Sequence, residues 1–372
     1  MTNAYARAGV DVDIEAKASR ILYEASKQTF ANRTDFIGEI VAPFDDFAGL
    51  KAVDIGELPA GSFMSMGFDT VGTKAEIAQR VGKHDTIAFD LLAMVCDDAV
   101  VRGGEPALVG SNLDIKSLGN DDRCLPIIRE LARGYVAAAR AAGVAIINGE
   151  IAQMGDLMTG WGDFPYHWGA ACVWFARKEK LFTGLEPQAG DAVVVLREKG
   201  FRTNGLTLAR SVFNETYGPE WHTQSFDQST IGESVLTPAI IYSRLLVKLH
   251  GGFKSDGSCN IHGVAHITGG GLPEKLGRVL RRSGTGARLT NLFAPSPIMM
   301  HCQQVGSVTD HDAYRAWNMG QGMAIITSEP EKAITGASDF GIEAQVAGMI
   351  TGEPGICIIS KGMETPDIEL AF

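Results

Sequence analysis

Residues 62–74, SFMSMGFDTVGTK, combine a short predicted strand near Ser62–Met66 with a compact polar motif. The motif GFDTVGTK brings a carboxylate, a glycine, a hydroxyl and an ammonium close together in the chain: Asp69, Gly72, Thr73 and Lys74. Such a set can hold a metal–polyphosphate pair. The carboxylate binds a hard cation, the glycine lets the backbone approach, and the hydroxyl and ammonium meet phosphate oxygens. The glycine spacing is not that of a Walker A loop, and a plain polar turn after a strand is the alternative.

The composition is that of a globular protein without a nucleic-acid or membrane partner. The 372 residues are 45% hydrophobic and 21% charged, and a chain of this length is suited to two domains. A net charge of −11 argues against nucleic acid, whose binding needs a basic face. The six cysteines form no CxxC pair, which makes structural zinc and disulfides poor interpretations. Without a signal peptide or an apolar run near about 18 residues, we expect a cytoplasmic protein.

The segment GLEPQAG, from Gly184 to Gly190, is typical of a connection between domains. We therefore expect an N-terminal domain of residues 1–183 and a C-terminal domain of residues 184–372. Helical and strand patterns alternate irregularly in the first half, and the second half repeats the same types of element. This mixture predicts an α+β fold rather than a doubly wound parallel sheet.

A helix predicted after Asp85 and Thr86, either of which can cap it, carries acids where apolar residues are expected. Asp98 continues the apolar stripe of this helix, while Asp97 shares a neighbouring face with Asp90. A carboxylate at a core position is costly unless it is paired or bound to a metal, so Asp98 indicates a cation site. The alternative is that the last two acids lie on an exposed C-terminal turn, against the helix dipole.

Three later segments also combine glycine with polar side chains. Glu150 follows Gly149 after a predicted buried strand, where it can reach into a shared site or simply end the strand. Two glycine turns precede predicted helices and resemble anion sites at helix N-termini, although each can also be a plain turn. Their residues are Thr203, Asn204, Gly205, Thr268, Gly269, Gly270 and Gly271. His266, just before the second turn, is either a general acid–base group or a structural histidine.

Eight segments stand in a familiar order: YARAGVDVD, GFDTVGTK, KHDTIAFDLLAM, DDAVVRGGEP, NGEIAQM, TNGLTLAR, VAHITGGGLPE and YRAWNMGQGM. Together they cover nearly the whole chain and resemble the phosphoribosylformylglycinamidine cyclo-ligase family, also called aminoimidazole ribonucleotide synthetase. The resemblance implies a homodimer in which strands of the N-terminal domain join a barrel across the subunit interface. It also implies an α+β C-terminal domain, with ATP and the substrate in a groove between the domains.

The family's reaction closes the imidazole ring of purine biosynthesis after ATP phosphorylates the amide oxygen of formylglycinamidine ribonucleotide. The resemblance implies that Mg²⁺ is held by Asp69, Asp98 and Glu150. It implies that the nucleotide is bound by Asp69, Gly72, Thr73, Lys74, Asp85 and Thr86. The two glycine turns, Thr203–Gly205 and Thr268–Gly271, would bind the phosphorylated ribonucleotide. The catalytic groups would be Lys74, Asp98 and His266, the last as a proton carrier.

Some positions depart from the family pattern, among them Thr70 in place of a glycine, Asp97 in place of an asparagine and Gln153 in place of an acid. These departures keep two alternatives open. One is another ATP-dependent enzyme of the same superfamily, such as a thiamine monophosphate kinase. The other is a catalytically weak nucleotide-binding paralogue with a regulatory role, although the retained Asp69 and Lys74 argue against it.

Overall fold

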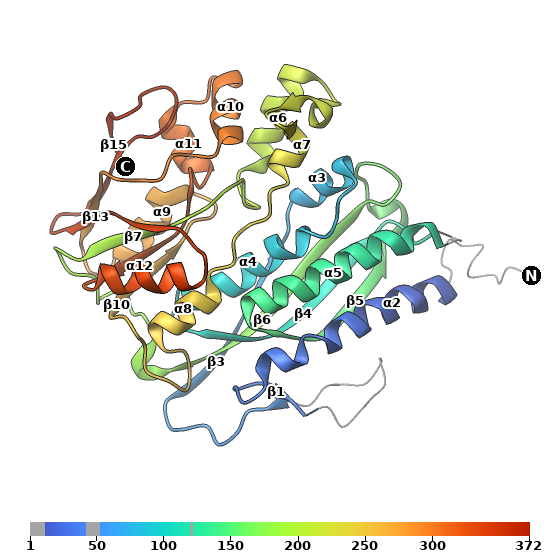
Figure 1. The fold of residues 1–372 in the computed structure, drawn as a ribbon, viewed down its shortest axis with the longest axis horizontal. Coiled ribbons are helices and arrows are strands. Elements are labelled where there is room, and N and C mark those ends of the chain that lie inside the picture. The colour runs from blue at the N-terminus through green and yellow to red at the C-terminus, as the bar shows by residue number, and fades with distance from the viewer. Residues whose placement is uncertain (1–11, 42–52, 120–121) are drawn as a thin grey trace, which may run out of the picture. The chain divides into compact units, whose positions relative to one another are not determined.

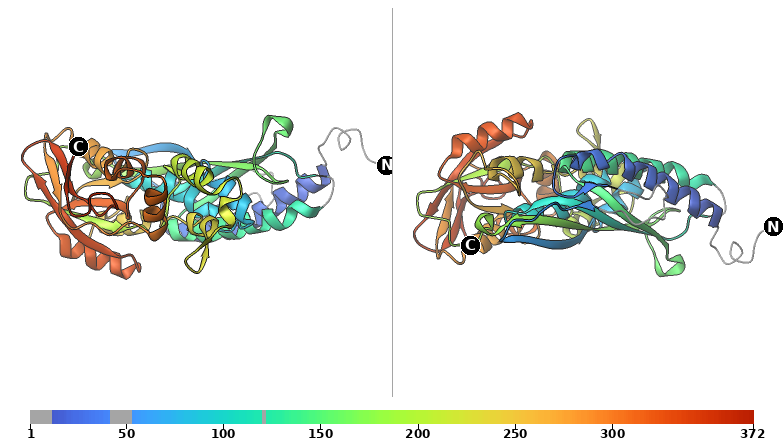
Figure 2. Two further views of the ribbon diagram at one scale, coloured as in Figure 1. Left: turned by 90° about the horizontal axis from the view of Figure 1, so that it is seen from above. Right: turned by 90° about the horizontal axis from the view of Figure 1, so that it is seen from below.

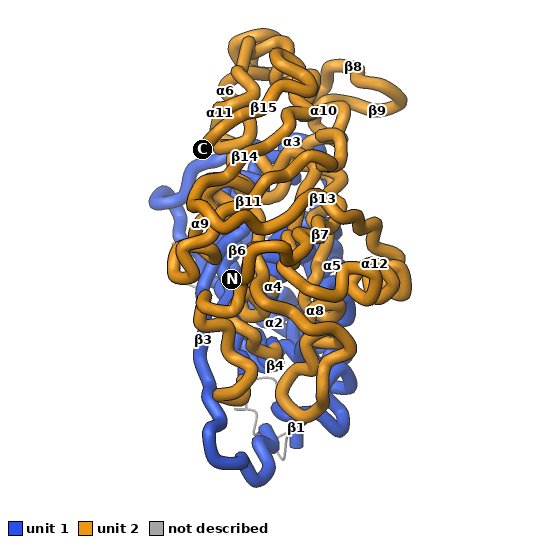
Figure 3. Tube along the Cα trace, turned by 90° about the vertical axis from the view of Figure 1, so that its left-hand side faces the viewer, with its two compact units in different colours: residues 1–96, 106–175 blue, residues 97–105, 176–372 orange. Residues whose placement is uncertain are grey.

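The computed structural model describes residues 12–41, 53–119 and 122–372, so most of the YARAGVDVD motif lies outside the described residues. The chain forms two compact units, residues 1–96 with 106–175 and residues 97–105 with 176–372 (Figure 3). The second unit therefore includes a short segment, residues 97–105, from within the first half of the chain. The boundary predicted between residues 183 and 184 leaves residues 97–105 in the N-terminal domain, whereas in the structure they belong to the second unit.

The first unit is built on a four-stranded sheet with helices on one face (Figures 1 and 2). The strand order is β3-β6-β4-β5, and β4 and β5 run parallel. The strands are β3 (Ser62–Thr70), β4 (Glu105–Ile115), β5 (Ala145–Gln153) and β6 (Tyr166–Arg177). The helices are α2 (Val12–Lys27), α3 (Lys74–Val81), α4 (Ile87–Val100) and α5 (Leu125–Ala142). A small antiparallel pair completes the unit, β1 (Glu39–Ile40) with β2 (Val53–Asp54), and short 3-10 turns lie at Phe30–Arg33, Asp122–Cys124 and Gly155–Leu157.

Helix α5 shows how local sequence fixes these elements. A proline in its first turn and Gly143 after its last residue, at φ 73°, mark its two ends. One face buries Ile128, Leu131 and Tyr135, and α2 packs against both this helix and β5. The buried face of α5 thus helps to form the core behind the sheet.

Two strands of this unit are longer than predicted. β3 continues past Met66 to Thr70, because its far end remains in the ladder beside β6. β5 continues past Asn148 to Gln153, since it stays paired with β4 over that length. Asp69, Gly149 and Glu150 therefore lie within strands rather than after them.

The second unit contains a mixed seven-stranded sheet of order β10-β12-β7-β13-β11-β14-β15, in which only β11 and β14 pair in parallel. Its strands are β7 (Ala192–Arg197), β10 (Ile261–His266), β11 (Gly286–Leu289), β12 (Gln321–Thr327), β13 (Ala344–Thr351), β14 (Gly355–Ile359) and β15 (Glu369–Ala371). The helices are α6 (Leu206–Tyr217), α7 (Ile231–Val235), α8 (Ser243–His250), α9 (Gly271–Leu280), α10 (Pro297–Val305), α11 (Asp310–Ala316) and α12 (Pro330–Asp339). A short hairpin joins β8 (Ser225–Phe226) to β9 (Ser229–Thr230), and 3-10 turns lie at Lys178–Lys180 and Trp221–Thr223.

The core of the second unit lies between the sheet and helices α8 and α12. Val194, Leu196 and Ile325 of the sheet pack with Leu245 and Leu249 of α8 in one buried cluster. Both units mix helices with a sheet in the irregular order expected, which confirms the α+β class. Among the described residues, no helix has the length and apolar character needed to cross a membrane.

Candidate active site

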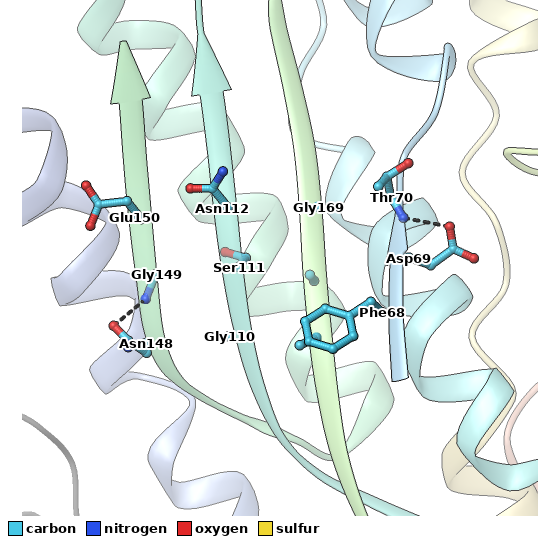
Figure 4. A pocket seen from close by; sticks show the side chains of 12 residues that line it. Phe68, Asp69, Thr70, Gly110, Ser111, Asn112, Asn148, Gly149, Glu150 and Gly169 are labelled. Carbon is cyan, nitrogen blue, oxygen red and sulfur yellow. Dashed lines mark hydrogen bonds between the residues drawn. The ribbon is translucent and has the colours of Figure 1, made fainter. Parts of the chain in front are cut away.

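The sheet of the first unit carries a cavity of about 660 Å³ (Figure 4). All four strands contribute to its lining, and half of the twelve lining residues are small: Gly110, Ser111, Gly149, Gly169, Ala170 and Ala171. Figure 4 shows Asp69 and Thr70 on one border, Asn148 and Glu150 on the other, and the side chains of Asn112 and Phe68 between them. Where the lining residues are small, a flat group can approach the backbone of the sheet while polar atoms contact its edges.

Asp69 and Glu150 occupy opposite edges of this sheet (Figure 4). β3 and β5 are separated by β6 and β4, so three inter-strand steps of about 4.8 Å place their backbones about 14 Å apart. Magnesium ligands lie only about 2.1 Å from the ion. The prediction that both carboxylates bind one cation is therefore wrong.

The polar motif places its ammonium in the interior. Gly72 takes a left-handed φ of 52° in the turn after β3, and Lys74 is the first residue of α3. Lys74 is fully buried, and its Nζ lies 2.7 Å from Oδ1 of the equally buried Asp90. The structure thus gives Lys74 a carboxylate partner where the sequence predicts a phosphate, while Thr73 stays exposed beside it.

Asp85 and Thr86 precede α4, as expected for residues at a helix N-terminus. The Oδ1 atom of Asp85 and the Oγ1 atom of Thr86 are buried and have no hydrogen-bond partner among the described residues. Gly134 of α5 lies so near that a Cβ there would come within 2.2 Å of the Asp85 carbonyl oxygen. Buried polar oxygens of this kind normally bind an ion, water or ligand.

In the second unit, Arg202 lies between two buried carboxylates. Its Nη1 donates to Oε2 of Glu198 at 2.8 Å, and its Nη2 donates to Oδ2 of Asp97 at 3.2 Å. Asp97 also accepts a hydrogen bond from the backbone N–H of Tyr242 at 2.9 Å. Burial raises the pKa of Asp97 to about 7, although the guanidinium and the backbone donor both act to lower it. The acid buried at the end of α4 is therefore Asp97, whereas the sequence pattern pointed to Asp98.

Asp98 is held by His266. Its side chain is 55% exposed, and its Oδ1 lies 2.7 Å from Nδ1 of the buried imidazole. The other ring nitrogen of His266 lies 2.9 Å from Nη2 of Arg202. Burial and the adjacent guanidinium lower the pKa of His266 to about 4. Partial burial acts to raise the pKa of Asp98, but the hydrogen bond from His266 and the nearby positive charges bring it below its usual value.

The two predicted glycine turns lie side by side. A Cβ built on Gly269 would be 3.5 Å from the side-chain nitrogen of Asn204. Both turns also pack against the end of α11, where Trp317 donates to the carbonyl oxygen of Gly205 at 3.1 Å. At Gly271, φ is 64° and a Cβ would lie 1.8 Å from a neighbouring carbonyl oxygen, so no other residue fits without movement. The N-termini of α6 and α9 are thereby brought together.

Two side-chain oxygens of the first turn can form further hydrogen bonds. Oγ1 of Thr203 and Oδ1 of Asn204 are buried and have no hydrogen-bond partner among the described residues. Thr268 and the glycines of the second turn are half-buried, except for the buried Gly271. Oriented donors and acceptors at two helix N-termini are suited to a phosphorylated ligand.

A second cavity, of about 220 Å³, lies beside β10 and α9 in the same unit. Asp98, His266 and Thr268 line it, together with five basic side chains: Arg102, Lys275, Arg278, Arg281 and Arg282. Asp98 is therefore a single carboxylate at the border of a basic cavity, an arrangement that suits a cation bound together with an anion.

The described residues contain no ready-made cluster of three or more His, Cys, Asp or Glu side chains for a metal ion. Arg202 and Glu198 are the charged groups that the sequence analysis missed. The available signal was an arginine in GFRTNG, directly before the first glycine turn, with a glutamate four residues earlier. Nothing local in that pattern predicts that both side chains are buried beside Asp97.

Two sequence models of one protein family match the chain. The model for "AIR synthase related protein, N-terminal domain" matches residues 45–162, and that for the C-terminal domain matches residues 188–361. Among similar curated proteins, the phosphoribosylformylglycinamidine cyclo-ligase of Pyrococcus furiosus is 32% identical over 97% of this chain and 98% of its own. The protein of the same name from Nitrosococcus oceani is 33% identical over 93% of this chain and 91% of its own.

Solved structures with lower sequence identity share the fold. Thiamine-monophosphate kinase from Stenotrophomonas maltophilia superimposes with a TM-score of 0.60 at 14% identity, covering 91% of this chain and 95% of its own. The hydrogenase maturation protein HypE in complex with ATP gives a TM-score of 0.55 at 14% identity, covering 86% of both chains. PurL of T. maritima, complexed with FGAR, gives 0.54 at 13% identity, covering 96% of this chain and 52% of that one.

Proposed function

The chain belongs to the phosphoribosylformylglycinamidine cyclo-ligase family, and from this premise we propose that it closes the imidazole ring of formylglycinamidine ribonucleotide at the expense of ATP. It is an enzyme of the ligase class that forms a carbon–nitrogen bond in purine biosynthesis. The observation that carries the proposal is the 32% identity to a cyclo-ligase over nearly the full length of both proteins.

The chemistry assigns the protein a positioning role. An amide oxygen is a poor leaving group, and transfer of a phosphoryl group from ATP makes it a good one. A nitrogen of the substrate then attacks the same carbon, and phosphate leaves. The protein must align the two substrates and neutralise developing negative charge.

We assign the nucleotide to the first unit. The small residues of the sheet floor leave room for a flat base, and Gly72 and Thr73 follow β3 at one edge of that floor. The partnerless oxygens of Asp85 and Thr86 offer further contacts. Lys74 supports this site from the interior through its ion pair with Asp90, rather than by touching a phosphate.

We assign the phosphorylated ribonucleotide to the second unit. Thr203–Gly205 and Thr268–Gly271 present two adjacent helix N-termini, and Oγ1 of Thr203 is buried without a partner among the described residues. Peptide N–H groups at such ends favour a phosphate without requiring a lysine. The two roles thus lie in different units, while the domain bounds expected from the sequence, residues 1–183 and 184–372, stay a prediction.

The carboxylates of Asp69 in the first unit and Asp98 in the second are hard oxygen donors of the kind that Mg²⁺ prefers, and we propose each of them as a Mg²⁺ ligand. Asp98 suits the role because His266 fixes one of its oxygens while the side chain stays half-exposed. Glu150 is left out, because it lies at the far edge of the sheet from Asp69. When bound, Mg²⁺ would offset the negative charge of the triphosphate.

We also propose a homodimer formed through β3. This nine-residue strand is at the edge of its sheet and exposes Phe63 (45%), Met64 (66%), Met66 (51%) and Phe68 (73%). A long apolar edge strand normally pairs with another chain or is covered. A second copy of the same strand would continue the sheet into the barrel that the family resemblance implies, in an enzyme that acts in the cytoplasm.

The test is ADP release by purified protein with ATP and Mg²⁺, measured with and without formylglycinamidine ribonucleotide. We expect release only when that substrate is present, together with formation of aminoimidazole ribonucleotide. Thiamine monophosphate is the matched control, because a kinase of the same fold would release ADP with it instead. Equal release in all samples, or none despite measurable ATP binding, would contradict the proposal, and the latter would favour a regulatory paralogue.

A further inference from the structure

We infer that His266 is a positioning residue, held by Arg202 as its neutral Nδ1–H tautomer, and that it fixes the Asp98 carboxylate instead of carrying a proton. The inference replaces the acid–base role predicted for His266. It relies on the proposed function only for the assignment of Asp98 to a divalent cation.

The first step is that the guanidinium cannot turn. Nη1 of Arg202 donates to Glu198 at 2.8 Å and to the carbonyl oxygen of Ile240 at 3.1 Å. Nη2 donates to Asp97 at 3.2 Å and meets Nε2 of His266 at 2.9 Å. All four N–H bonds of the two terminal nitrogens are thus used, and the side chain is almost fully buried. An arginine side chain has donors and no acceptor.

The second step follows for the imidazole. Because the guanidinium only donates, Nε2 of His266 must present its lone pair to it. The ring proton then belongs to Nδ1, which donates to Oδ1 of Asp98 at 2.7 Å. An imidazolium would turn an N–H toward the guanidinium. A ring rotated by 180° would place carbon atoms against both partners, with loss of two hydrogen bonds.

The third step concerns reactivity. His266 is only 3% exposed, its lone pair faces Arg202 and its N–H faces Asp98, so neither nitrogen is left to exchange a proton with a substrate. The arrangement instead fixes the orientation of the Asp98 carboxylate. One oxygen of that carboxylate is held, and the 55% exposed side chain reaches the cavity beside β10. Hydrogen-bonded partners of this kind orient carboxylates that bind metal ions.

The direct test is nitrogen NMR of the whole protein labelled with ¹⁵N-histidine, near neutral pH. Couplings between ring nitrogens and ring protons distinguish the tautomers, and loss of one spin system in His266→Asn identifies the residue. We expect a protonated Nδ1 and an unprotonated Nε2. The opposite tautomer, or a charged ring, would overturn the inference. This measurement involves no substrate, so its result does not depend on the proposed reaction.

The second test compares two substitutions by the Mg²⁺ dependence of binding of a non-hydrolysable ATP analogue and by turnover at saturating Mg²⁺. His266→Ala should lower the affinity for Mg²⁺ about 10–100-fold, as loss of a hydrogen bond that supports a metal ligand typically does. His266→Asn keeps an N–H near the position of Nδ1 and should retain most of the affinity and turnover. Equal loss of turnover in both variants, at saturating Mg²⁺, would show that the imidazole moves a proton.

The matched control is His222→Asn, in the same unit. His222 is also buried beside a carboxylate, since its Nε2 lies 3.5 Å from Oε2 of Glu220, and it lines neither of the two cavities. We expect this variant to keep the Mg²⁺ affinity of the unmodified protein. A loss equal to that of His266→Ala would overturn the inference, because the effect would then follow any buried histidine beside a carboxylate.

Discussion

In the first unit the candidate site is a sheet face of small side chains, whereas in the second it is a buried set of charged groups. The sheet floor contains Gly110, Gly149 and Gly169 among its lining residues. The other site joins Arg202, Asp97 and His266 through hydrogen bonds with almost no exposure. The first region supplies room, and the second supplies fixed charge. Substitutions should therefore affect binding in the first and stability in the second.

Both units also contain buried cations, and Lys74 of the first can be compared with Arg202 of the second. Lys74 forms an ion pair with the buried Asp90, whereas Arg202 forms ion pairs with two buried carboxylates, those of Asp97 and Glu198. Breaking a buried ion pair is costly mainly because the remaining charge stays in the interior. The cost should therefore rise with the number of carboxylates left behind.

The largest effect is expected for Arg202→Met, which leaves two carboxylates buried without their cation. We expect the free energy of unfolding of the second unit to fall by about 3–5 kcal/mol. Urea unfolding followed by tryptophan fluorescence measures the change. Arg278→Met is the control, because that arginine pairs with Glu274 at the surface and should cost less than about 1 kcal/mol. A similar small change in both variants would contradict the expected cost of leaving buried carboxylates without their cation.

Lys74→Met should cost about 3 kcal/mol, the lower end of that range, because the buried carboxylate of Asp90 loses this cation. The double variant Lys74→Met with Asp90→Leu should recover most of this loss, since neither charge of the pair then stays in the interior. Unfolding midpoints of the three proteins give the comparison. If stability stays unchanged while ATP affinity collapses, Lys74 binds phosphate after all.

The sheet face should respond in the opposite way. In Gly169→Val the new Cβ meets only ordinary contacts, with Thr70 at 3.5 Å and beyond, so stability should change by less than about 1 kcal/mol. Gly169 alternates with the buried Trp168 and Ala170, so the new side chain points to the open face of the sheet and fills part of the floor. We expect the Kd for ATP to rise about tenfold, which is about 1.4 kcal/mol. Ala152→Val, on β5 and outside the cavity lining, should leave the Kd unchanged. Equal affinities in the two variants would place the nucleotide elsewhere.

The smallest expected effect is a pH dependence at His84 in the first unit. Burial lowers the pKa of His84, although Glu130 and Asp85 oppose the shift. Below about pH 6.5 the unfolded chain takes up a proton that the folded protein refuses, so stability should fall as the pH falls from 7.5 to 5. His84→Gln should show a flatter dependence in urea titrations at several pH values. If the free energy of unfolding changes with pH equally in both proteins, the buried imidazole of His84 does not contribute to the pH dependence.

Local patterns predicted those parts of the fold that depend on neighbours in sequence. Helices α6 and α9 begin directly at the two glycine turns, as the sequence predicts. The longer extents of β3 and β5 do not follow from local patterns, because pairing with strands distant in sequence keeps Asp69 and Glu150 in the sheet. Strand order likewise decided that these two carboxylates lie far apart.

The acids at the end of α4 show the same limit. Asp97 lies seven residues after Asp90, and this spacing correctly predicts one face, since both are fully buried. The apolar stripe alone favoured Asp98 as the buried acid, yet its side chain is 55% exposed. What decides between adjacent positions is Arg202, more than one hundred residues later in the chain, and no helical periodicity contains that information.

The membership of residues 97–105 in the second unit has a consequence for dividing this protein at the level of its gene. A single cut between residues 183 and 184 would give a C-terminal fragment that retains Arg202, Glu198 and His266 but has lost Asp97 and Asp98. Such a fragment would carry an arginine missing one of its two counter-ions and a histidine without the carboxylate that it orients. Independent expression of the second half, or its exchange as a genetic cassette, would therefore require these nine residues to be supplied as well, in the manner of fragment complementation.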